Sequence, residues 1–243
     1  MTLAPSAAPS AALIFAAGLG TRMRPLTDDR PKALVEVGGR TLLDRALDRV
    51  KEAGIPRAVV NVHAFPDQMR AALARRKDLD ILVSDESDLL LETGGGMRKA
   101  LPLLGPGPVL ALNADAVWTG AAPVPALLEA WEGARMGLLL LVVEKARAVG
   151  YARAGDFLLD EASRLSRPPA GEAAPWVYTG AQILDPALLV DQPEGPFSLS
   201  RVFFAEASAG RASGLRHAGG WADVGTPAGI PAAEALLREA GEA

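Results

Sequence analysis

The chain of 243 residues contains no cysteine, and this absence removes several kinds of site at once. Thiolate zinc sites, iron–sulfur clusters, disulfide scaffolds and a cysteine nucleophile are all excluded. Histidine is scarce as well, because His63 and His217 are the only two in the sequence. Neither has a companion histidine or cysteine to complete a metal site, so we assign neither a metal-binding nor a catalytic role.

Long apolar runs and a large excess of one charge are also missing. The apolar stretch Ala11–Ala17 is far shorter than the roughly 20 residues of a transmembrane helix. No Lys or Arg precedes Arg22, so the charged start of a secretory signal is absent. Twenty-five basic and 29 acidic side chains give a net charge of −4, and no overall field favours nucleic acid. We therefore expect a cytoplasmic protein that binds small molecules, with no nucleic-acid or membrane partner.

Short apolar segments alternate with helical patterns along the first 143 residues. The predicted strands cover residues 12–17, 33–37, 58–62, 79–84, 109–113 and 137–143, and the predicted helices cover 41–53, 66–76, 97–104 and 124–131. Repeated units of this kind predict an α/β fold, Rossmann-like and doubly wound, with a mostly parallel sheet and helices on both faces. After residue 144 the pattern changes to a hairpin (150–167), a proline-rich loop (167–175), a strand (176–184) and a closing helix (230–240). This part predicts a small antiparallel insertion on the substrate side.

A glycine-rich loop, Gly18-Leu19-Gly20, follows the first predicted strand. The dinucleotide-binding fingerprint needs a third glycine where this chain has Met23, and the Walker pattern occurs nowhere in the chain. Glycine N–H groups can approach a phosphate closely, and Arg22 and Lys32 add two cations nearby. This combination suits a triphosphate better than a nicotinamide dinucleotide. A tight turn with two solvated cations is the alternative, and for an isolated Gly-x-Gly it is the better explanation.

The loop and its continuation resemble the signature of the sugar-1-phosphate nucleotidyltransferases. That signature, GxGxRxxPLTxxxPKxL, is matched without interruption from Gly18 to Leu34. The resemblance implies that Arg22 holds a nucleoside triphosphate, that Lys32 contacts phosphate near the reacting centre, and that both are catalytic together with Asp115. The residues it implies for nucleotide binding are Ala17, Gly18, Gly20, Thr21, Arg22, Lys32, Glu92, Gly94, Gly95 and Asn113.

Two aspartates are candidate ligands of Mg²⁺, which prefers one or two carboxylates together with phosphate oxygens. Asp115 follows the predicted strand VLALN, and ligands bind at the carboxyl ends of parallel strands. Asp223 lies in Trp-Ala-Asp-Val-Gly-Thr, which is similar to the family's late metal-binding motif. Taken alone, Asp115 is as well explained by a helix or turn cap, and Asp223 is better explained by a turn before a helix. The family usually has Asn-Gly-Asp at the first site, where this chain has Ala114.

A second glycine-rich segment reads Leu91-Glu92-Thr93-Gly94-Gly95-Gly96. Three glycines ahead of a helix indicate close approach of the backbone to a flat or anionic group, or else a flexible hinge. In the family this loop lies against the base. Its form resembles that of the uridylyltransferases acting on N-acetylmuramate 1-phosphate in cell-wall recycling, whereas mannose-1-phosphate guanylyltransferases more usually have Gly-Thr-Ala/Gly-Gly.

Sugar contacts rest on the resemblance alone. The positions that match family residues facing the sugar phosphate are Trp118, Gly155, Thr179 and Gly180. A tryptophan three residues after Asp115 also fits core packing, and on its own that is the better explanation. The family's Glu-Lys-Pro is absent, and the nearest match is Arg-Pro-Pro at 167–169. Glu172 is a candidate substitute for the missing acidic group.

The resulting hypothesis is one nucleotidyltransferase domain over residues 11–243, preceded by a flexible tail over residues 1–10. Residues 11–143 form its nucleotide-binding half and residues 144–243 its sugar-binding half. We expect Mg²⁺-dependent nucleotidyl transfer to a sugar 1-phosphate, with UTP and N-acetylmuramate 1-phosphate favoured over a mannose- or heptose-1-phosphate guanylyltransferase. The alternatives of another class are a non-catalytic sugar-nucleotide-binding regulatory protein and a Rossmann oxidoreductase. The apolar segment Val177–Leu189 fits a core strand and a homodimer interface equally well, so the sequence is compatible with both a monomer and a homodimer.

Overall fold

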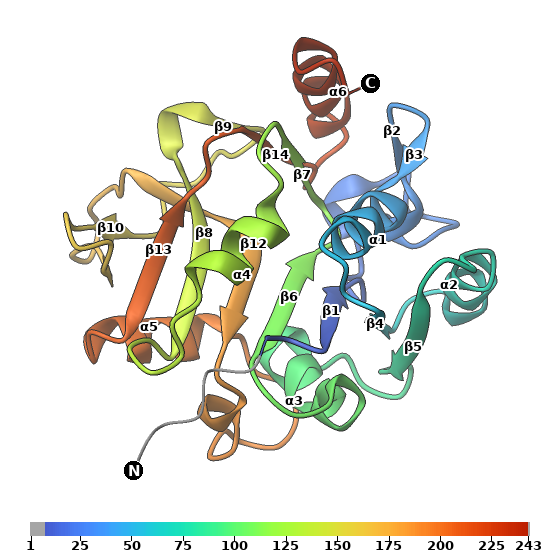
Figure 1. The fold of residues 1–243 in the computed structure, drawn as a ribbon. Helices are drawn as coiled ribbons and strands as arrows, with labels where there is room; N and C mark the ends of the chain where they lie inside the picture. Colours follow the sequence, from blue (N-terminus) through green and yellow to red (C-terminus); the bar gives the residue numbers. More distant parts are fainter. Residues whose placement is uncertain (1–7, 243) are drawn as a thin grey trace.

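A computed structural model of the chain describes residues 8–242 and has a seven-stranded sheet at its centre (Figure 1). The strand order is β13-β8-β12-β6-β1-β4-β5. Strand β12 is antiparallel to both of its neighbours, and every other adjacent pair is parallel. The predicted mostly parallel sheet is therefore confirmed. Its strands are β1 (Ala11–Phe15), β4 (Arg57–Val62), β5 (Asp80–Asp85), β6 (Val109–Asn113), β8 (Leu138–Glu144), β12 (Trp176–Leu184) and β13 (Ala212–Arg216).

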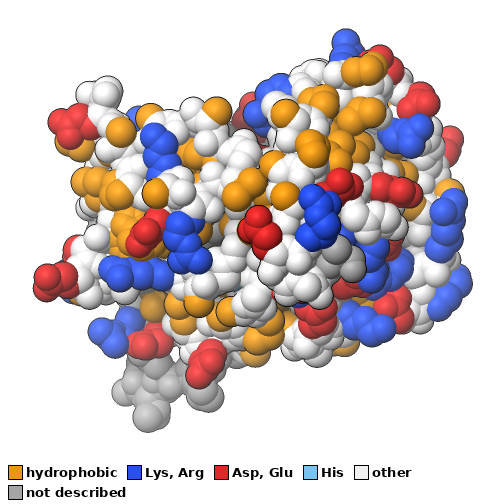
Figure 2. All heavy atoms as spheres, turned by 90° about the horizontal axis from the view of Figure 1, so that it is seen from above, with side chains coloured by type: hydrophobic (Ala, Val, Ile, Leu, Met, Phe, Trp, Pro, Cys, Tyr) orange, Lys and Arg blue, Asp and Glu red, His pale blue; other side chains and the backbone are white. Residues whose placement is uncertain are grey.

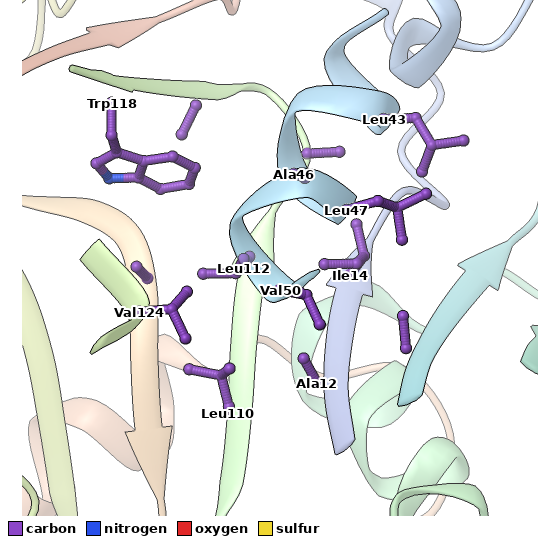
Figure 3. Packing of buried hydrophobic residues seen from close by; sticks show 14 of the residues in the cluster. Ala12, Ile14, Leu43, Ala46, Leu47, Val50, Leu110, Leu112, Trp118 and Val124 are labelled. Carbon is purple, nitrogen blue, oxygen red and sulfur yellow. The ribbon is translucent and has the colours of Figure 1, made fainter. Parts of the chain in front are cut away.

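Helices cover both faces of this sheet, as the alternating pattern predicts. One face carries α1 (Leu42–Glu52), α2 (Pro66–Leu73) and α4 (Pro123–Ala130), and the other carries α3 (Glu92–Leu104) and α5 (Ser200–Ser208). Thr41 caps α1 by accepting a hydrogen bond from the Asp44 N–H at 3.0 Å. Leu47 and Val50 of α1 lie against Ile14 of β1 in the buried core (Figure 3). The two apolar layers hold the carboxyl ends of β1 and β6 side by side.

A smaller sheet stands at the end of the molecule where β1 and β6 finish (Figure 1). It has the order β7-β14-β9, formed by β7 (Ala116–Thr119), β14 (Gly220–Asp223) and β9 (Ala148–Val149). Helix α6 (Gly229–Glu239) packs on β14 and β7 through Ala233 and Leu237. This sheet brings the late part of the chain back to the end of β6.

The short elements complete the chain and include the predicted hairpin. That hairpin is the antiparallel pair β10 (Leu158–Leu159) and β11 (Leu165–Ser166). A second antiparallel pair joins β2 (Glu36–Val37) to β3 (Arg40–Thr41). Four 3₁₀ turns are η1 (Thr21–Met23), η2 (Lys32–Leu34), η3 (Lys145–Arg147) and η4 (Pro186–Leu189).

Several predicted boundaries differ from the structure for identifiable reasons. The strand predicted at 33–37 is wrong, because η2 occupies Lys32–Leu34 and only Glu36–Val37 pairs with β3. Helix α3 begins at Glu92 instead of residue 97, since Gly94–Gly96 are helical. Helix α5 and strand β13 were not predicted, because they are stabilised by packing on the sheet and by pairing with β8 rather than by a clear local pattern.

The structure also bears on the termini and on the apolar segment Val177–Leu189. Of the tail predicted over residues 1–10, residues 1–7 lie outside the described part, whereas the Ser10 hydroxyl donates to the Leu104 carbonyl at 3.1 Å. Most of the apolar segment belongs to β12, which lies between β6 and β8 and is buried there as core. Over residues 8–242, no helix has the length and apolar character needed to cross a bilayer.

Candidate active site

The first glycine-rich loop connects β1 to η1 and lines a cleft of about 400 Å³ at the end of the sheet. Gly20 has a φ of +65°, a left-handed conformation that glycine adopts without steric penalty. A Cβ at this position would lie 3.0 Å from the Cβ of Lys32, so the loop folds closely onto η2. The Thr27 hydroxyl donates to the Gly20 carbonyl at 2.8 Å and fixes this turn. Ala17, Gly18 and Lys32 all line the cleft.

Lys32 and Asp115 form the ion pair at the centre of the cleft. Lys32 Nζ lies 2.7 Å from Asp115 Oδ2, and their side chains are 13% and 34% exposed. A hydrogen bond between two ionised groups at this distance is among the stronger polar contacts of a protein. Lys32 comes from the first signature and Asp115 from the end of β6, so the pair joins two of the predicted motifs.

Asp223 is brought to Asp115 by the register of the small sheet. Strands β14 and β7 are antiparallel with Asp223 opposite Ala116, and the Val224 N–H donates to the Asp115 carbonyl at 2.9 Å. Burial raises the pKa of Asp223 above its usual range, and the negative charge of Asp115 raises that pKa further. The two carboxylates are thus close enough to repel each other, which is the arrangement that a cation relieves.

The side chain of Arg22, which belongs to η1, also lies near Asp223. A Cβ added to Gly225 would lie 3.0 Å from Asp223 Oδ1 and 3.3 Å from Arg22 Nη2, so the two side chains flank this glycine. The predicted catalytic residues Arg22, Lys32 and Asp115 are therefore brought together with Asp223. Thr21, the first residue of η1, is exposed in the same loop.

The described residues contain no group of three or more His, Cys, Asp or Glu side chains arranged for a metal. Two carboxylates are nevertheless the number that Mg²⁺ takes from a protein when phosphate oxygens and water supply its other ligands. The mutual repulsion that contributes to the raised pKa of Asp223 fits a cation between Asp115 and Asp223. This pair of residues therefore fits the predicted metal site.

A buried polar pair, Asn61 and Glu86, supports the cleft and was not identified from the sequence. Asn61 Oδ1 accepts from the N–H groups of Ala16 at 2.7 Å and Ala17 at 3.2 Å. Asn61 Nδ2 donates to Glu86 Oε1 at 2.8 Å, and the Leu91 N–H donates to Glu86 Oε2 at 3.3 Å. Burial raises the pKa of Glu86, and the hydrogen bond from Asn61 opposes that rise. The pair ties the first loop to the start of α3.

A polar residue inside an apolar strand was the signal for this pair. Asn61 interrupts the buried strand AVVNV, and buried polar groups of that kind are normally hydrogen-bonded to something specific. His63 lies beside the pair, where its Nδ1 makes a 2.7 Å hydrogen bond with the Glu86 carbonyl. The other histidine, His217, is buried, and burial lowers its pKa.

We expect Asn61→Ala to lower the free energy of unfolding by about 2–4 kcal/mol, because three buried polar groups lose their partner. It should also raise the KM for the nucleotide, since the loop at Ala16 and Ala17 loses its anchor. Chemical denaturation and steady-state kinetics measure the two effects. Asn61→Asp is the matched variant: it keeps the acceptor but sets a second carboxylate against Glu86, so its stability should recover as the pH falls. An Asn61→Ala protein with unchanged stability and KM would contradict this role.

The second glycine-rich segment does not lie as predicted. Glu92 and Thr93 line the cleft, and Glu92 has a left-handed φ of +57°. Gly94 and Gly95, predicted to bind nucleotide, are buried, and both donate their N–H to the Phe197 carbonyl at 2.8 and 3.2 Å. A Cβ on Gly94 would lie 2.2 Å from the Phe197 ring. The N–H groups of both glycines are therefore occupied by the Phe197 carbonyl, and the glycines make room for the chain segment at Gly195 and Phe197.

Two of the predicted sugar contacts are also corrected. Trp118 is 2% exposed and packs in the core near Val124 and Leu112, so its ring offers no face to a sugar (Figure 3). Thr179 is fully buried, with its hydroxyl donating to the Leu141 carbonyl and its own carbonyl accepting from Trp221 Nε1. Both side chains are buried, and neither lines the cleft.

The other two predicted sugar contacts, Gly155 and Gly180, lie at positions of close packing. Gly180 packs on Asn113, the last residue of β6, where a Cβ would come within 2.9 Å of the Asn113 Cβ. Gly155 has a φ of +100° and sits against the Ala174 carbonyl, at 1.9 Å from the position of a Cβ. Asn113 lines the cleft. Glu172, the candidate substitute for the missing acidic group, is exposed in the loop before β12.

Acidic and basic side chains are mixed across this end of the molecule, which Figure 2 views face on. No broad region of one sign is seen on this face.

Comparison with known proteins agrees with this geometry. Residues 12–178 match the family described as the MobA-like NTP transferase domain. The chain is 45% identical over 97% of its length to an N-acetylmuramate alpha-1-phosphate uridylyltransferase of Caulobacter vibrioides, which it covers completely. It is 35% identical over 93% of its length to a protein of the same name from Neisseria meningitidis, of which it covers 97%. Among solved structures, the inositol-1-phosphate CTP transferase of T. maritima superposes with a TM-score of 0.79 at 16% identity, over 98% of each chain.

The chain is thus a sugar-1-phosphate nucleotidyltransferase of the MobA-like NTP transferase domain family. The interpretation of the unbroken signature from Gly18 to Leu34 as that of a nucleotidyltransferase is confirmed. The same family match argues against the two alternatives, a Rossmann oxidoreductase and a non-catalytic regulatory protein.

Proposed function

We propose that this protein transfers the uridylyl group of UTP to N-acetylmuramate 1-phosphate, giving UDP-N-acetylmuramate and pyrophosphate, with Mg²⁺ as its cofactor. The observation that carries the proposal is the cluster of Lys32, Asp115 and Asp223 at the end of β6. The choice of base and sugar is supported by the segment Leu91–Gly96 and by the name of the relatives at 45% and 35% identity. A cytoplasmic location fits substrates of this kind.

In the proposed reaction an oxygen of the sugar 1-phosphate attacks the α-phosphorus of UTP. A new P–O bond forms, the bond between the α-phosphorus and the bridging oxygen breaks, and pyrophosphate leaves with that electron pair. No general base is required, because the attacking phosphate is already ionised. The two substrates repel each other, so most of the stabilisation has to come from fixed positive charge.

Residues of this chain supply that charge on the nucleotide side. The ammonium of Lys32, held by η2, and the guanidinium of Arg22, held by η1, neutralise phosphate oxygens as charge builds on the leaving group. Gly18 leaves room for the phosphates beside the loop backbone, and Gly20 supplies the left-handed turn that folds the loop onto Lys32. Asp115 and Asp223 would hold Mg²⁺, which would offset phosphate charge and orient the reacting groups.

Pyrophosphate release in the presence of Mg²⁺ tests the proposal directly. UTP, GTP, CTP, dTTP and ATP are each combined with the 1-phosphates of N-acetylmuramate, N-acetylglucosamine, glucose and mannose. We expect turnover with UTP and N-acetylmuramate 1-phosphate, and its loss when EDTA removes the metal. Turnover confined to GTP with mannose 1-phosphate would instead assign a guanylyltransferase, and binding of a triphosphate without release from any pair would contradict the proposed reaction.

A further inference from the structure

Arg153 is a cation near Asp223 that the signature motifs do not include. It lies in the loop between β9 and β10, and its side chain is 73% exposed. The start of this loop packs closely against Asp223, the last residue of β14. A Cβ on Gly150 would lie only 2.4 Å from the Asp223 carbonyl oxygen. The positive charge of Arg153 acts on Asp223, together with those of Lys32 and Arg22. Arg153 is thus a third cation whose charge acts on Asp223, and it comes from a segment of the chain far from Arg22 and Lys32.

The guanidinium of Arg153 is held by an aromatic ring and by a long ion pair with Asp156. It stacks on the ring of Tyr151, with Cζ 4.8 Å from the ring centroid. The acidic group nearest to it, Asp156, is 3.8 Å away, which is too long for a hydrogen bond. Across residues 8–242 no acceptor takes a hydrogen bond from Arg153. Its five donors are therefore available to a ligand.

Asp156 is itself occupied, so it does not compete for those donors. Its Oδ1 accepts from the Tyr151 hydroxyl at 2.9 Å, and its Oδ2 accepts from the Tyr178 N–H at 3.0 Å. Asp156 thus fixes Tyr151, and Tyr151 fixes the plane on which the guanidinium rests. The arrangement resembles a prepared anchor for a planar anion, because a guanidinium binds a carboxylate through two parallel hydrogen bonds.

The chemistry of the proposed substrate supplies such an anion. N-acetylmuramate 1-phosphate differs from N-acetylglucosamine 1-phosphate by a lactyl ether on O3, which ends in a carboxylate. The 1-phosphate has to reach the centre at Lys32, Asp115 and Asp223, whereas this carboxylate is several bonds away from it. A guanidinium near Asp223 that donates no hydrogen bond to the described residues has the charge to meet it.

We propose that Arg153 binds the lactyl carboxylate. The enzyme would thereby select N-acetylmuramate 1-phosphate over N-acetylglucosamine 1-phosphate, which has no carboxylate on its ring. This inference rests on the proposed function. Hydrogen bonds to charged groups are strong enough for their loss to weaken binding by about 10- to 100-fold. The effect concerns one substrate, because N-acetylglucosamine 1-phosphate has no group for Arg153 to hold.

The test compares Arg153→Gln with the wild-type enzyme on both sugar phosphates at saturating UTP. We expect the KM for N-acetylmuramate 1-phosphate to rise at least about tenfold with kcat little changed, and both constants for N-acetylglucosamine 1-phosphate to stay within about twofold. Calorimetry should show the same selective weakening for UDP-N-acetylmuramate against UDP-N-acetylglucosamine. Arg135→Gln removes a cation of similar exposure away from the cleft and should change neither sugar.

Each other outcome overturns the inference in a recognisable way. An equal rise in KM for both sugar phosphates would show that Arg153 binds the 1-phosphate instead of the carboxylate. An unchanged KM for both would show that Arg153 does not bind the sugar phosphate. Wild-type enzyme that does not accept N-acetylmuramate 1-phosphate with UTP would refute the proposed function, and the inference with it. Wild-type turnover that Arg153→Gln leaves unaltered would refute the inference alone.

Discussion

Replacing Asp223 by Asn is expected to lower kcat/KM by about a thousandfold or more, and Asp115→Asn should have a similar effect. A loss of that size corresponds to about 4 kcal/mol of transition-state stabilisation, which is within the range that a metal ligand contributes. Steady-state pyrophosphate release over a range of Mg²⁺ concentrations measures it. The double variant should be little worse than either single one, because residues that hold one ion act as a unit.

Stability separates this role from a structural one. The pKa of Asp223 is raised, so its ionised form is disfavoured in the folded state and lowers stability at pH values above that pKa. A neutral asparagine removes this penalty, and Asp223→Asn should unfold at the same or a higher temperature at pH 7.5. The difference should shrink as the pH falls and the wild-type carboxyl takes up its proton. Near-normal kcat in either variant would remove that residue from the metal site.

Lys32→Ala is expected to reduce kcat by about 100-fold or more, which is typical for losing a fixed charge that stabilises a transition state. Its ammonium is mostly buried and lies 2.7 Å from Asp115, so the substitution removes charge at the reacting centre and leaves a carboxylate without its partner. The lost pair should lower the free energy of unfolding by about 1–3 kcal/mol. Kinetics and denaturation on the same preparation show whether turnover suffers more than folding.

Lys51→Ala is the matched control for Lys32. Lys51 also forms an ion pair, at 2.9 Å from Asp78, but on the outer surface of α1 and with 55% of its side chain exposed. Exposed pairs contribute about 0–1 kcal/mol, so this variant should fold and turn over like the wild type. A Lys32→Ala protein that is unfolded on purification would favour a purely structural ion pair.

Short-range motifs account for the part of the site that could be predicted. The string from Gly18 to Leu34 is contiguous, so the sequence itself carries its glycine turn and its two cations, and the structure assembles it as expected. Asp115 was placed correctly because a residue just after a buried parallel strand must lie at the carboxyl edge of the sheet. Predictions of this kind depend on chain order and strand direction alone.

The errors arose where a residue type was interpreted without its neighbours. Gly94 and Gly95 indicated a ligand, but the atoms that come close to them belong to Gly195 and Phe197, about a hundred residues later. Trp118 matched a sugar position, yet the strand that follows Asp115 turns its ring into the core. A glycine or a tryptophan shows that something packs closely, and only the fold shows what it is.

By itself, the sequence determined the class of fold and the family, and it predicted which charged groups would carry the chemistry, because these depend on local pattern and on motif order. Only the tertiary structure decided which of those groups meet. The pairing of β14 with β7 brings Asp223 to Asp115, and the hydrogen bonds of Asn61 and Glu86 join the two glycine-rich segments. Such contacts join residues that are distant along the chain or in separate segments, and they form only when the apolar layers fix the ends of the strands together.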